Sequence, residues 1–247
     1  MNQNRIKIFS IPIDAFTMEQ TLEFIGESIR AKKQLHHTVV NAGKIVMMQD
    51  DKQLFESVVN ADLINADGQA VVWAARLLGK KLPERVAGID LMEKLVAFAH
   101  KQGYKIFLFG AREDVVTAVA DVYRKKYSDK IIAGYRNGYY KPEDELQIAQ
   151  QIASSGAQIL FVAISSPKKE NFLFRYKDML KDVNFIMGVG GSFDVVSNKT
   201  KRAPVWMQKL GLEWFYRFAQ EPRRMWYRYT VGNFRFIMLT LKELVKK

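Results

Sequence analysis

An alternation of short apolar runs with helix-like stretches constrains the fold of this chain more than any other feature of its sequence. The apolar runs lie at residues 5–9, 36–42, 61–67, 104–111, 130–140, 158–166 and 183–191. Stretches with helical periodicity lie between them, at residues 17–32, 44–58, 90–101, 113–126, 143–154 and 168–180. Near-continuous apolar strands that alternate with helices are typical of a mostly parallel sheet. We therefore predict an α/β fold with helices on both faces of the sheet.

The carboxyl ends of the predicted strands carry polar residues and glycines. In parallel sheets, ligands bind at this edge, in the loops that lead into the following helices. The residues that fall there are Asn41, Asp67, Gly110, Ser165–Ser166 and Gly190–Gly191. Their coincidence at one edge is the main structural argument that the sequence offers for a binding site.

The composition excludes several kinds of chemistry. The 247 residues include no cysteine, which removes disulfides, thiolate metal sites and cysteine nucleophiles. His36, His37 and His100 lack metal-ligand spacing with acidic residues, and the chain has no P-loop, nucleophile elbow or D-x-D motif. No apolar run reaches the ~18 residues of a membrane span, and no signal peptide is recognisable. We expect a cytoplasmic protein.

The alternation ends after Val196, so we interpret residues 1–196 as the α/β domain and residues 197–247 as a helical appendage. The net charge of the chain is +12, and residues 201–247 contribute +8 through eleven lysines and arginines against three glutamates. Three of the four tryptophans lie in the same segment. Basic residues among aromatics favour an anionic partner, either a lipid surface or nucleic acid. We rank membrane contact first, and the alternative is a helix that packs its aromatics into the core.

Asp67 and Arg85 each admit a structural and a functional interpretation. An aspartate before Gly68 at a strand end is commonly a helix N-cap, although its place at the ligand-facing edge also suits a catalytic carboxylate. Arg85, beside Pro83, could hold a diphosphate through two parallel hydrogen bonds, or it could be a solvated loop residue. The residues alone leave both alternatives open.

Two further segments could bind phosphate. The turn "MGVGGSFDVVS" follows a strand, but Phe193 stands where a dinucleotide fingerprint requires glycine. In "AISSPKKENF", Ser166 is predicted as a helix N-cap and Pro167 as the first helical residue. The free N–H groups of that helix and the following two lysines could hold an anion, or the segment could be an ordinary capped helix.

Six motifs, in order over nearly the whole chain, resemble one family. They are "NADGQAVVWAARLLG", "ERVAGIDL", "FLFGARE", "SSPKKE", "GVGGSFDVVSNKTKRAP" and "LEWFYRFAQEPRRMWYRY". Each motif alone is weakly specific, but the ordered set resembles the WecG/TagA/CpsF family of bacterial glycosyltransferases. The resemblance implies a Rossmann-like α/β domain whose C-terminal appendage completes the site at the membrane.

The resemblance also implies an inverting, metal-independent transferase that uses a UDP-sugar as co-substrate and no cofactor. In well-known members, N-acetylmannosamine or its uronic acid is joined to N-acetylglucosamine on a polyprenyl diphosphate. The products serve wall teichoic acid, enterobacterial common antigen or related surface polysaccharides. We accordingly expect peripheral contact with anionic lipid at the inner face of the cell membrane, and no nucleic-acid partner. The family also suggests self-association.

The family's functional positions carry over residue by residue. Asp67 matches the proposed catalytic base, which takes a proton from the acceptor hydroxyl as that oxygen attacks the anomeric carbon. Asn41 matches a polar pocket residue, and Arg85 matches an arginine placed for a diphosphate. The other residues expected to contact substrate are Lys169, Glu170, Gly110, Gly190 and Gly191.

The appendage carries the arginines that the resemblance assigns to the lipid diphosphate and the membrane, namely Arg217, Arg223, Arg224 and Arg228. Spacings of seven and four place Arg217, Arg224 and Arg228 near one helical face, provided that the helix continues through Pro222.

Two residues depart from the family's pattern. Lys169 stands where the family usually has glutamine, and a cation there suits an anionic donor group or a phosphate better than a neutral amide does. Asn198 stands where glycine is frequent, and asparagine tolerates the left-handed backbone conformation, so we expect the turn to persist.

Other functions compete with this interpretation. A member of the same family could use a different donor or acceptor, as in hexosyl or uronosyl transfer for capsule or exopolysaccharide. A nucleotide-dependent oxidoreductase would fit the strand–helix alternation, but the glycine fingerprint is missing. A nucleic-acid binder would fit the pI of about 9.7, and its basic residues should then form a continuous stripe.

Overall fold

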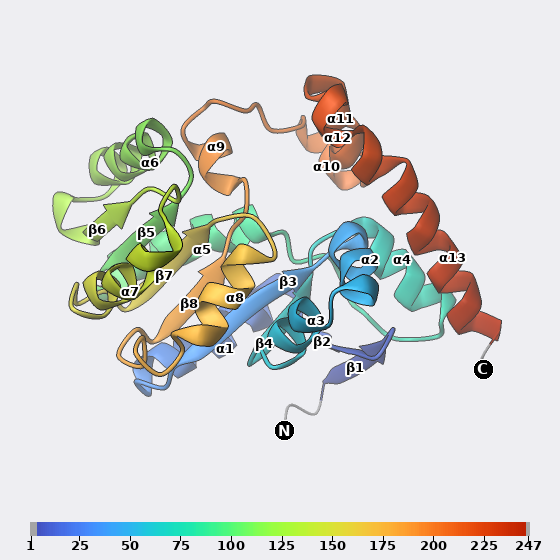
Figure 1. The fold of residues 1–247 in the computed structure, drawn as a ribbon, viewed down its shortest axis with the longest axis horizontal. Coiled ribbons are helices and arrows are strands. Elements are labelled where there is room, and N and C mark those ends of the chain that lie inside the picture. The colour runs from blue at the N-terminus through green and yellow to red at the C-terminus, as the bar shows by residue number, and fades with distance from the viewer. Residues whose placement is uncertain (1–3, 246–247) are drawn as a thin grey trace.

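Six parallel strands form the central sheet of the protein (Figure 1). The computed structural model describes residues 4–245, apart from the side chains of Arg224, Tyr227 and Arg228. The strand order is β4–β3–β8–β7–β5–β6, and every neighbouring pair is parallel. The strands are β3 (Leu35–Val40), β4 (Leu63–Ala66), β5 (Ile106–Gly110), β6 (Ile132–Arg136), β7 (Ile159–Ala163) and β8 (Phe185–Gly188). The predicted parallel α/β fold is confirmed.

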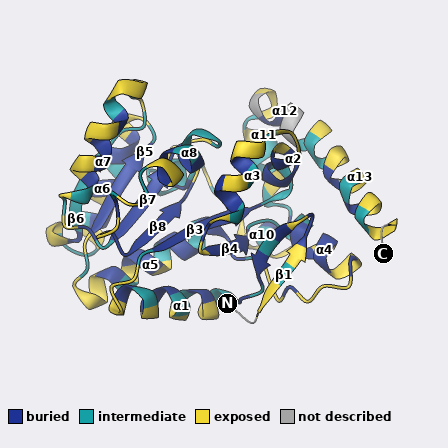
Figure 2. Cartoon of the chain, turned by 60° about the horizontal axis from the view of Figure 1, so that its bottom comes forward, coloured by how far each residue is buried: buried dark blue, intermediate teal, exposed yellow. Residues whose placement is uncertain are grey.

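Helices cover both faces of this sheet, because the strand residues that point to either face are apolar. Along β5, Ile106 and Leu108 belong to one buried cluster, and Phe107 and Phe109 belong to another. The first cluster includes residues of α1 (Met18–Arg30), α5 (Gly88–Gln102) and α6 (Glu113–Lys126). The clusters of the other face include residues of α2 (Ala42–Asp50), α3 (Lys52–Val59), α7 (Glu145–Ala153) and α8 (Lys168–Arg175). Figure 2 shows the strands buried between these layers, apart from the edge strand β6, whose residues are of intermediate exposure.

The order of the strands brings three loops together at one edge. The chain runs outward from β3 to β4 and from β5 to β6, and it then returns through β7 to β8, which pairs with β3. The carboxyl ends of β4, β3 and β8 are therefore neighbours. The loops that leave these ends carry Asp67, Asn41 and Gly190–Gly191, as expected for the ligand-binding edge of a parallel sheet.

Two predictions about individual elements were wrong, and one strand was missed. The helical stretch predicted at 44–58 is two helices, because the Asp51 side chain accepts the Leu54 N–H (2.9 Å) and caps the start of α3. The helix predicted to reach residue 180 ends at Arg175. A second strand, β2 (Ile11–Asp14), pairs antiparallel with β1 (Arg5–Ile8) and was not predicted, because it is short and contains Pro12.

Short helical elements complete the α/β part of the chain. Helix α4 (Gln69–Leu77) and the β1–β2 hairpin contribute to the apolar cluster that α2 and α3 form beside β4. The remaining elements are two 3₁₀ turns, Asp129–Ile131 and Pro142–Asp144, and helix α9 (Ser192–Val196). Asn198 follows α9 with a φ of 59°, so the left-handed turn that we expected there is present.

Four helices form the C-terminal part: α10 (Val205–Lys209), α11 (Glu213–Gln220), α12 (Pro222–Tyr229) and α13 (Val231–Val245). The helix does not continue through Pro222, because proline lacks the N–H that would extend the helical hydrogen bonds. Arg217 therefore lies on a different helix from Arg224 and Arg228. Helix α13 returns to the α/β domain, where Phe236 packs edge-on against Phe9 at 5.7 Å. Among the described residues, no helix is long and apolar enough to span a bilayer.

Candidate active site

Asp67 lies at the end of β4, where the backbone and a neighbouring helix fix its position. Its N–H donates to the Val40 carbonyl of the adjacent strand (2.8 Å). Its carboxylate accepts a hydrogen bond from the backbone N–H of Gly88, the first residue of α5. Helix α4, which follows Asp67 in the chain, has no side-chain cap. Asp67 therefore does not cap α4, although the structural interpretation of this residue predicted such a cap. Its carboxylate faces the start of α5 instead.

The surroundings of Asp67 raise the pKa of its carboxyl group above the ordinary value for aspartate. Burial is the largest cause, and the nearby Glu213 carboxylate acts in the same direction. Arg85, the Gly88 hydrogen bond and Lys44 oppose the increase. A half-buried carboxylate with a raised pKa is a stronger proton acceptor than a solvated one, which suits a general base.

Arg85 lies near Asp67 because the segment that carries it is attached to the end of β4. The N–H of Val86 donates to the Ala66 carbonyl (2.9 Å), and the Val86 side chain is buried. The guanidinium of Arg85 is 3.0 Å from Glu213 on α11. Arg85 is therefore not the solvated loop residue of the structural interpretation, since an ion pair holds it at the edge of the site.

The partner of Arg85 belongs to a chain of ion pairs that fixes the C-terminal helices to the sheet. Arg202 lies 3.5 Å from the other oxygen of Glu213, and it binds Asp90 of α5 through two hydrogen bonds of 2.6 and 2.7 Å. Two parallel hydrogen bonds from guanidinium to carboxylate are among the strongest polar contacts in proteins. Sequence reasoning missed Asp90, Arg202 and Glu213, because no spacing in the chain relates residues so far apart.

Asn41 lies beside Asp67 at the end of the neighbouring strand β3. Its side-chain oxygen accepts the N–H of Lys44 (3.0 Å) and so caps α2. A methyl group added to Gly68 would come within 3.5 Å of the Asn41 Cβ, which shows how close the two strand-end loops are. The capping bond uses the oxygen of the Asn41 amide, and its NH₂ group is the part that could reach a sugar hydroxyl.

A buried charged cluster lies at the same edge, between α2 and α8. Lys44 donates to Glu170 (2.8 Å) and to the hydroxyl of Thr38 (3.3 Å), and Lys169 lies 3.3 Å from the same Glu170 oxygen. The two lysines and the glutamate are all buried. One carboxylate faces two ammonium groups, so the cluster has a surplus positive charge. Lys44 was not predicted, and the only signal for it is a lysine within the apolar stretch "GKIVMM".

The pKa values of this cluster reflect its shared charges. Burial alone would raise the pKa of Glu170, but Lys44 and Lys169 lower it to about 2. Burial and the proximity of Lys44 lower the pKa of Lys169 to about 8, against the opposing effect of Glu170. The second oxygen of Glu170 is buried and has no hydrogen-bond partner among the described residues. Lys169 is therefore a cation that a bound anion would stabilise.

Ser166 does not cap α8, so that prediction was wrong. Its hydroxyl donates to the carboxylate of Glu170 (2.9 Å), and the helix begins one residue later than expected, at Lys168. Ser166 binds Glu170 in preference to the backbone, because a hydrogen bond to a buried carboxylate is stronger than one to a neutral backbone group.

The predicted glycines differ in what their lack of a side chain allows. A Cβ on Gly110 would lie 2.4 Å from the Ala163 carbonyl oxygen, so glycine there permits close contact of β5 with β7. Gly190 has a φ of 53° and open space around it. A Cβ on Gly191 would lie 2.5 Å from the guanidinium of Arg217. Arg217 of α11 thus lies directly on the glycine turn after β8.

The other predicted arginines belong to α12. Arg223 is exposed on α12. The side chains of Arg224 and Arg228 lie outside the described part of the structure, so their predicted role is not addressed. Among the described residues, no group of three or more His, Asp or Glu side chains is arranged to hold a metal ion.

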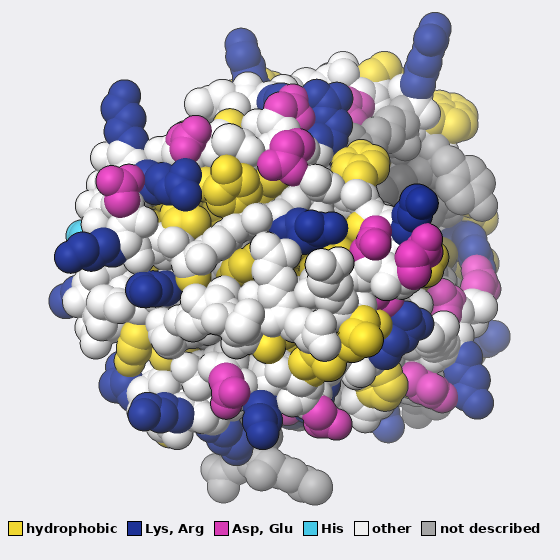
Figure 3. All heavy atoms as spheres, turned by 60° about the vertical axis from the view of Figure 1, so that its left-hand side comes forward, with side chains coloured by type: hydrophobic (Ala, Val, Ile, Leu, Met, Phe, Trp, Pro, Cys, Tyr) yellow, Lys and Arg dark blue, Asp and Glu magenta, His cyan; other side chains and the backbone are white. Residues whose placement is uncertain are grey.

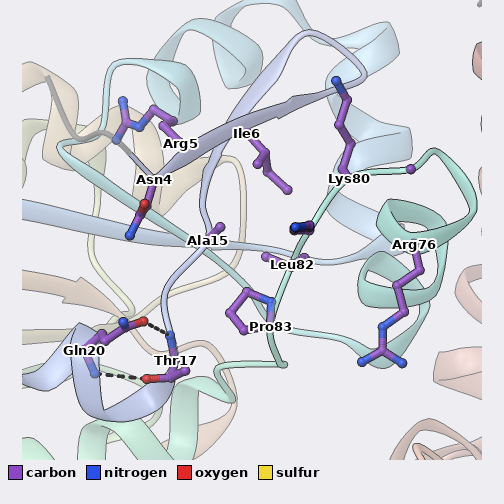
Figure 4. A pocket seen from close by; sticks show the side chains of 12 residues that line it. Asn4, Arg5, Ile6, Ala15, Thr17, Gln20, Arg76, Lys80, Leu82 and Pro83 are labelled. Atoms are coloured by element: carbon purple, nitrogen blue, oxygen red, sulfur yellow. Dashed lines mark hydrogen bonds between the residues drawn. The ribbon is translucent and has the colours of Figure 1, made fainter.

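A separate open groove lies between the amino-terminal hairpin and the loop after α4 (Figure 4). It contains four basic side chains, but Arg5 is already bound to Asp14 through two hydrogen bonds of 2.9 Å. The remaining three are Arg76, Lys80 and Lys81. None of the predicted site residues lines this groove, which distinguishes it from the Asp67 site.

Comparison with known proteins agrees with the motifs and the geometry. A sequence model of the family described as "Glycosyl transferase WecG/TagA/CpsF family" matches residues 6–247. A curated relative from Bacillus subtilis (strain 168) is 39% identical over 193 residues, which are 78% of this chain and 73% of the relative. That protein is named N-acetylglucosaminyldiphosphoundecaprenol N-acetyl-beta-D-mannosaminyltransferase. This chain is therefore a glycosyltransferase and belongs to the WecG/TagA/CpsF family.

Proposed function

We propose that this enzyme transfers N-acetylmannosamine from UDP to the N-acetylglucosamine of a polyprenyl-diphosphate acceptor, with inversion at the anomeric carbon. The observation that carries the proposal is the carboxylate of Asp67. It lies at the ligand-facing edge of the sheet, has a raised pKa and has Arg85 beside it. The name of the Bacillus subtilis relative supports the same donor sugar and the same class of acceptor.

The reaction requires one base and a means of stabilising the leaving group. Asp67 accepts the proton of the acceptor hydroxyl while that oxygen forms a bond to the anomeric carbon. The bond from the anomeric carbon to the phosphate oxygen breaks, and its electron pair leaves with UDP. A positioned base of this kind contributes ~10²–10⁴-fold to the rate.

Basic side chains at the same edge supply positive charge for the departing diphosphate. Arg85 is paired with Glu213, and a diphosphate could replace or share that carboxylate. Arg217 lies on the Gly191 turn, and its Nε is buried without a hydrogen-bond partner among the described residues. An arginine with unused N–H donors is well suited to phosphate oxygens. We therefore propose that these arginines, and no metal ion, neutralise the leaving group.

The C-terminal helices supply the surface for a lipid-linked acceptor. Several large apolar side chains on them are exposed, including Trp214, Trp226, Phe234 and Ile237. Exposed apolar and aromatic residues among basic ones are characteristic of helices that lie in a membrane interface. We propose that this part of the protein contacts the inner face of the cell membrane, where it meets the acceptor for surface polysaccharide synthesis.

A second donor is favoured by one observation. Lys169 is buried in a cluster with surplus positive charge. A carboxylate on the donor sugar would compensate this charge. The alternative function is therefore transfer of the uronic acid of N-acetylmannosamine to the same class of acceptor.

One face of the molecule does not support nucleic-acid binding. On the face of the molecule that Figure 3 shows, lysines and arginines are interspersed with acidic side chains and do not form a continuous stripe. A nucleic-acid surface would be expected to gather its basic residues along one track.

The proposal is tested by product formation from a short-chain prenyl-diphosphate-N-acetylglucosamine acceptor. A panel of UDP-sugars is supplied, including N-acetylmannosamine, its uronic acid and N-acetylglucosamine, with and without EDTA. We expect transfer from one mannosamine-type donor, unchanged by EDTA. Strict dependence on a divalent metal would overturn the arginine assignment, and transfer only from unrelated donors would overturn the substrate assignment.

A further inference from the structure

Helix α4 of the α/β domain exposes apolar side chains of its own, outside the C-terminal helices. Its inner side is buried through Val71, Val72 and Ala75. Trp73 and Leu77 lie four residues apart, on one helical face, and are 52% and 56% exposed. Single exposed apolar residues are ordinary in soluble proteins, but a contiguous set indicates an interaction surface.

The exposed face of α4 continues onto α10. A Cβ on Gly211, which follows α10, would lie 3.6 Å from the Trp73 ring. Trp206 and Leu210 are also four residues apart, and they are 60% and 59% exposed. Trp73, Leu77, Trp206 and Leu210 therefore form one surface, which we call the α4–α10 patch. Both helices lie in the half of the molecule away from α6 and α7 (Figure 1).

The two segments that carry the α4–α10 patch have only positive charges. Residues 68–83 and 203–212 include no aspartate or glutamate. They include Arg76, Lys80, Lys81 and Lys209, all of which are exposed. Because two copies of this surface would bring like charges together, self-association through it is unfavourable. Aromatic and aliphatic side chains on segments with basic residues are complementary to an anionic lipid surface.

We propose that the α4–α10 patch is a second membrane contact, which seats the α/β domain itself on an anionic bilayer. Trp73 and Leu77 enter the interfacial region, while Arg76 and Lys80 meet lipid phosphates. This inference rests on the proposed function, since it assumes that the acceptor is carried by a membrane lipid. It extends the membrane contact from the C-terminal helices to the catalytic domain.

The position of α4 in the chain gives this contact a consequence for catalysis. The helix begins at Gln69, two residues after Asp67, and Leu77 lies at its far end. A bilayer under the exposed face of α4 therefore lies within one helix length of the catalytic carboxylate, about 14 Å for nine residues. A contact that includes α4 as well as the C-terminal helices also fixes the orientation of the enzyme on the membrane better than the C-terminal helices alone do. The acceptor diphosphate at the lipid surface would then meet the site edge in a defined geometry.

The test is co-sedimentation of the full-length protein with vesicles of phosphatidylglycerol and phosphatidylcholine. The variant is Trp73→Ser with Leu77→Ser. We expect its partition coefficient to fall at least about tenfold, because interfacial binding scales with the apolar area that enters the membrane. Leu77→Ser alone, which leaves Trp73 in place, should give a smaller loss in the same direction.

A matched control comes from apolar residues of similar type and exposure elsewhere. Phe174 of α8 and Leu146 of α7 are 53% and 49% exposed, and these helices cover β5, β7 and β8. Phe174→Ser with Leu146→Ser should partition as the wild type does. Vesicles of phosphatidylcholine alone should bind the wild type weakly, and added salt should weaken binding to anionic vesicles.

Activity measurements separate this inference from the proposed function. Transfer to an acceptor embedded in vesicles should fall in the Trp73/Leu77 double variant, while transfer to a short-chain, water-soluble acceptor should be unchanged. If no donor is transferred but the partition loss is observed, the proposed function fails and the membrane contact stands. Wild-type partition of the double variant, or an equal loss in the Phe174/Leu146 control, would overturn the inference. A shift from dimer to monomer in sedimentation velocity, with vesicle binding unchanged, would instead assign the surface to self-association.

Discussion

Glu213 of α11 lies 3.0 Å from the guanidinium of Arg85 and raises the pKa of Asp67, so one carboxylate of the C-terminal part acts on two residues of the candidate site. Arg217 lies one helical turn further along α11, on the Gly191 turn. A single face of α11 therefore contacts the site through two residues. This arrangement makes the electrostatics of the site depend on the position of the C-terminal helices.

The first prediction concerns Glu213→Gln. Removing this negative charge lowers the pKa of Asp67, because Glu213 contributes to its increase. Asp67 must be ionised to act as a base, so the acid limb of the kcat/KM profile should move to lower pH. Glu243→Gln on α13 is the matched control. An unchanged profile in Glu213→Gln would show that Glu213 does not act on the base.

Gly191→Ala tests the position of the Arg217 side chain against the Gly191 turn. Gly191 has a φ of −80°, which alanine adopts without strain, but the new Cβ would meet the Arg217 guanidinium. Because only the end of a flexible side chain must move, the free energy of unfolding should change by no more than ~0.5 kcal/mol. We expect kcat/KM to fall about tenfold or more, towards the ~10²–10³-fold cost of a lost oxyanion donor.

A double-mutant cycle separates this effect from a general disturbance of the turn. In an Arg217→Ala background, Gly191→Ala should cost little further activity, since both changes remove the same guanidinium. Fully additive losses in the double variant would mean that Gly191 acts independently of Arg217.

Lys169→Gln tests the link between the buried cluster and an anionic donor. The pKa of Lys169 is lowered to about 8, so its positive charge is present below that pH and is lost as the pH rises through it. Affinity for a UDP-uronic acid should therefore fall above about pH 8. In Lys169→Gln, this pH dependence should disappear and KM for the anionic donor should rise about tenfold, equivalent to ~1.4 kcal/mol.

The neighbouring lysine provides the control for that experiment. The ammonium of Lys168 lies over the Tyr140 ring at 3.5 Å, away from Glu170. Lys168→Gln should keep the KM values of the wild type for both donors. An equal effect of both substitutions would indicate a general loss of positive charge rather than a specific role of Lys169.

Two buried histidines of β3 should make the stability of the protein sensitive to acid. Burial lowers the pKa of His36 to about 4 and that of His37 to about 3, against an opposing effect of Asp62 on His36 and of the Asn65 hydrogen bond on His37. Between the unfolded value near 6.5 and these values, the unfolded chain binds protons that the folded protein does not. The free energy of unfolding should therefore decrease as pH falls below about 6.5, by up to ~1.4 kcal/mol per pH unit for each histidine.

Denaturant unfolding between pH 8 and pH 4.5 measures this slope. His36→Gln and His37→Gln should each reduce it, whereas His100→Gln, on the exposed side of α5, should not. A slope that survives both substitutions would assign the acid sensitivity to other groups, such as the salt-bridged carboxylates.

The sequence predicted the sheet, the strand ends and most of the residues that meet there, because apolar periodicity determines which segments are strands and where they stop. It could not predict contacts between distant residues, such as Glu213 with Arg85 or Lys44 with Glu170. It also misplaced Ser166, because capping propensity assumes a backbone partner and the structure offers a buried carboxylate instead. Asp67 is a related case, since its carboxylate accepts a hydrogen bond from the first residue of α5 and does not cap α4.

The most direct test of the central claim is the initial rate of sugar transfer to lipid-diphosphate-linked N-acetylglucosamine by the wild type and by Asp67→Asn. Because burial raises the pKa of Asp67, its charge destabilises the fold at neutral pH, and the neutral asparagine should not decrease the free energy of unfolding. The account predicts a variant that is at least as stable as the wild type and at least ~10²-fold slower. A stable variant with near-normal turnover would contradict the assignment of Asp67 as the base.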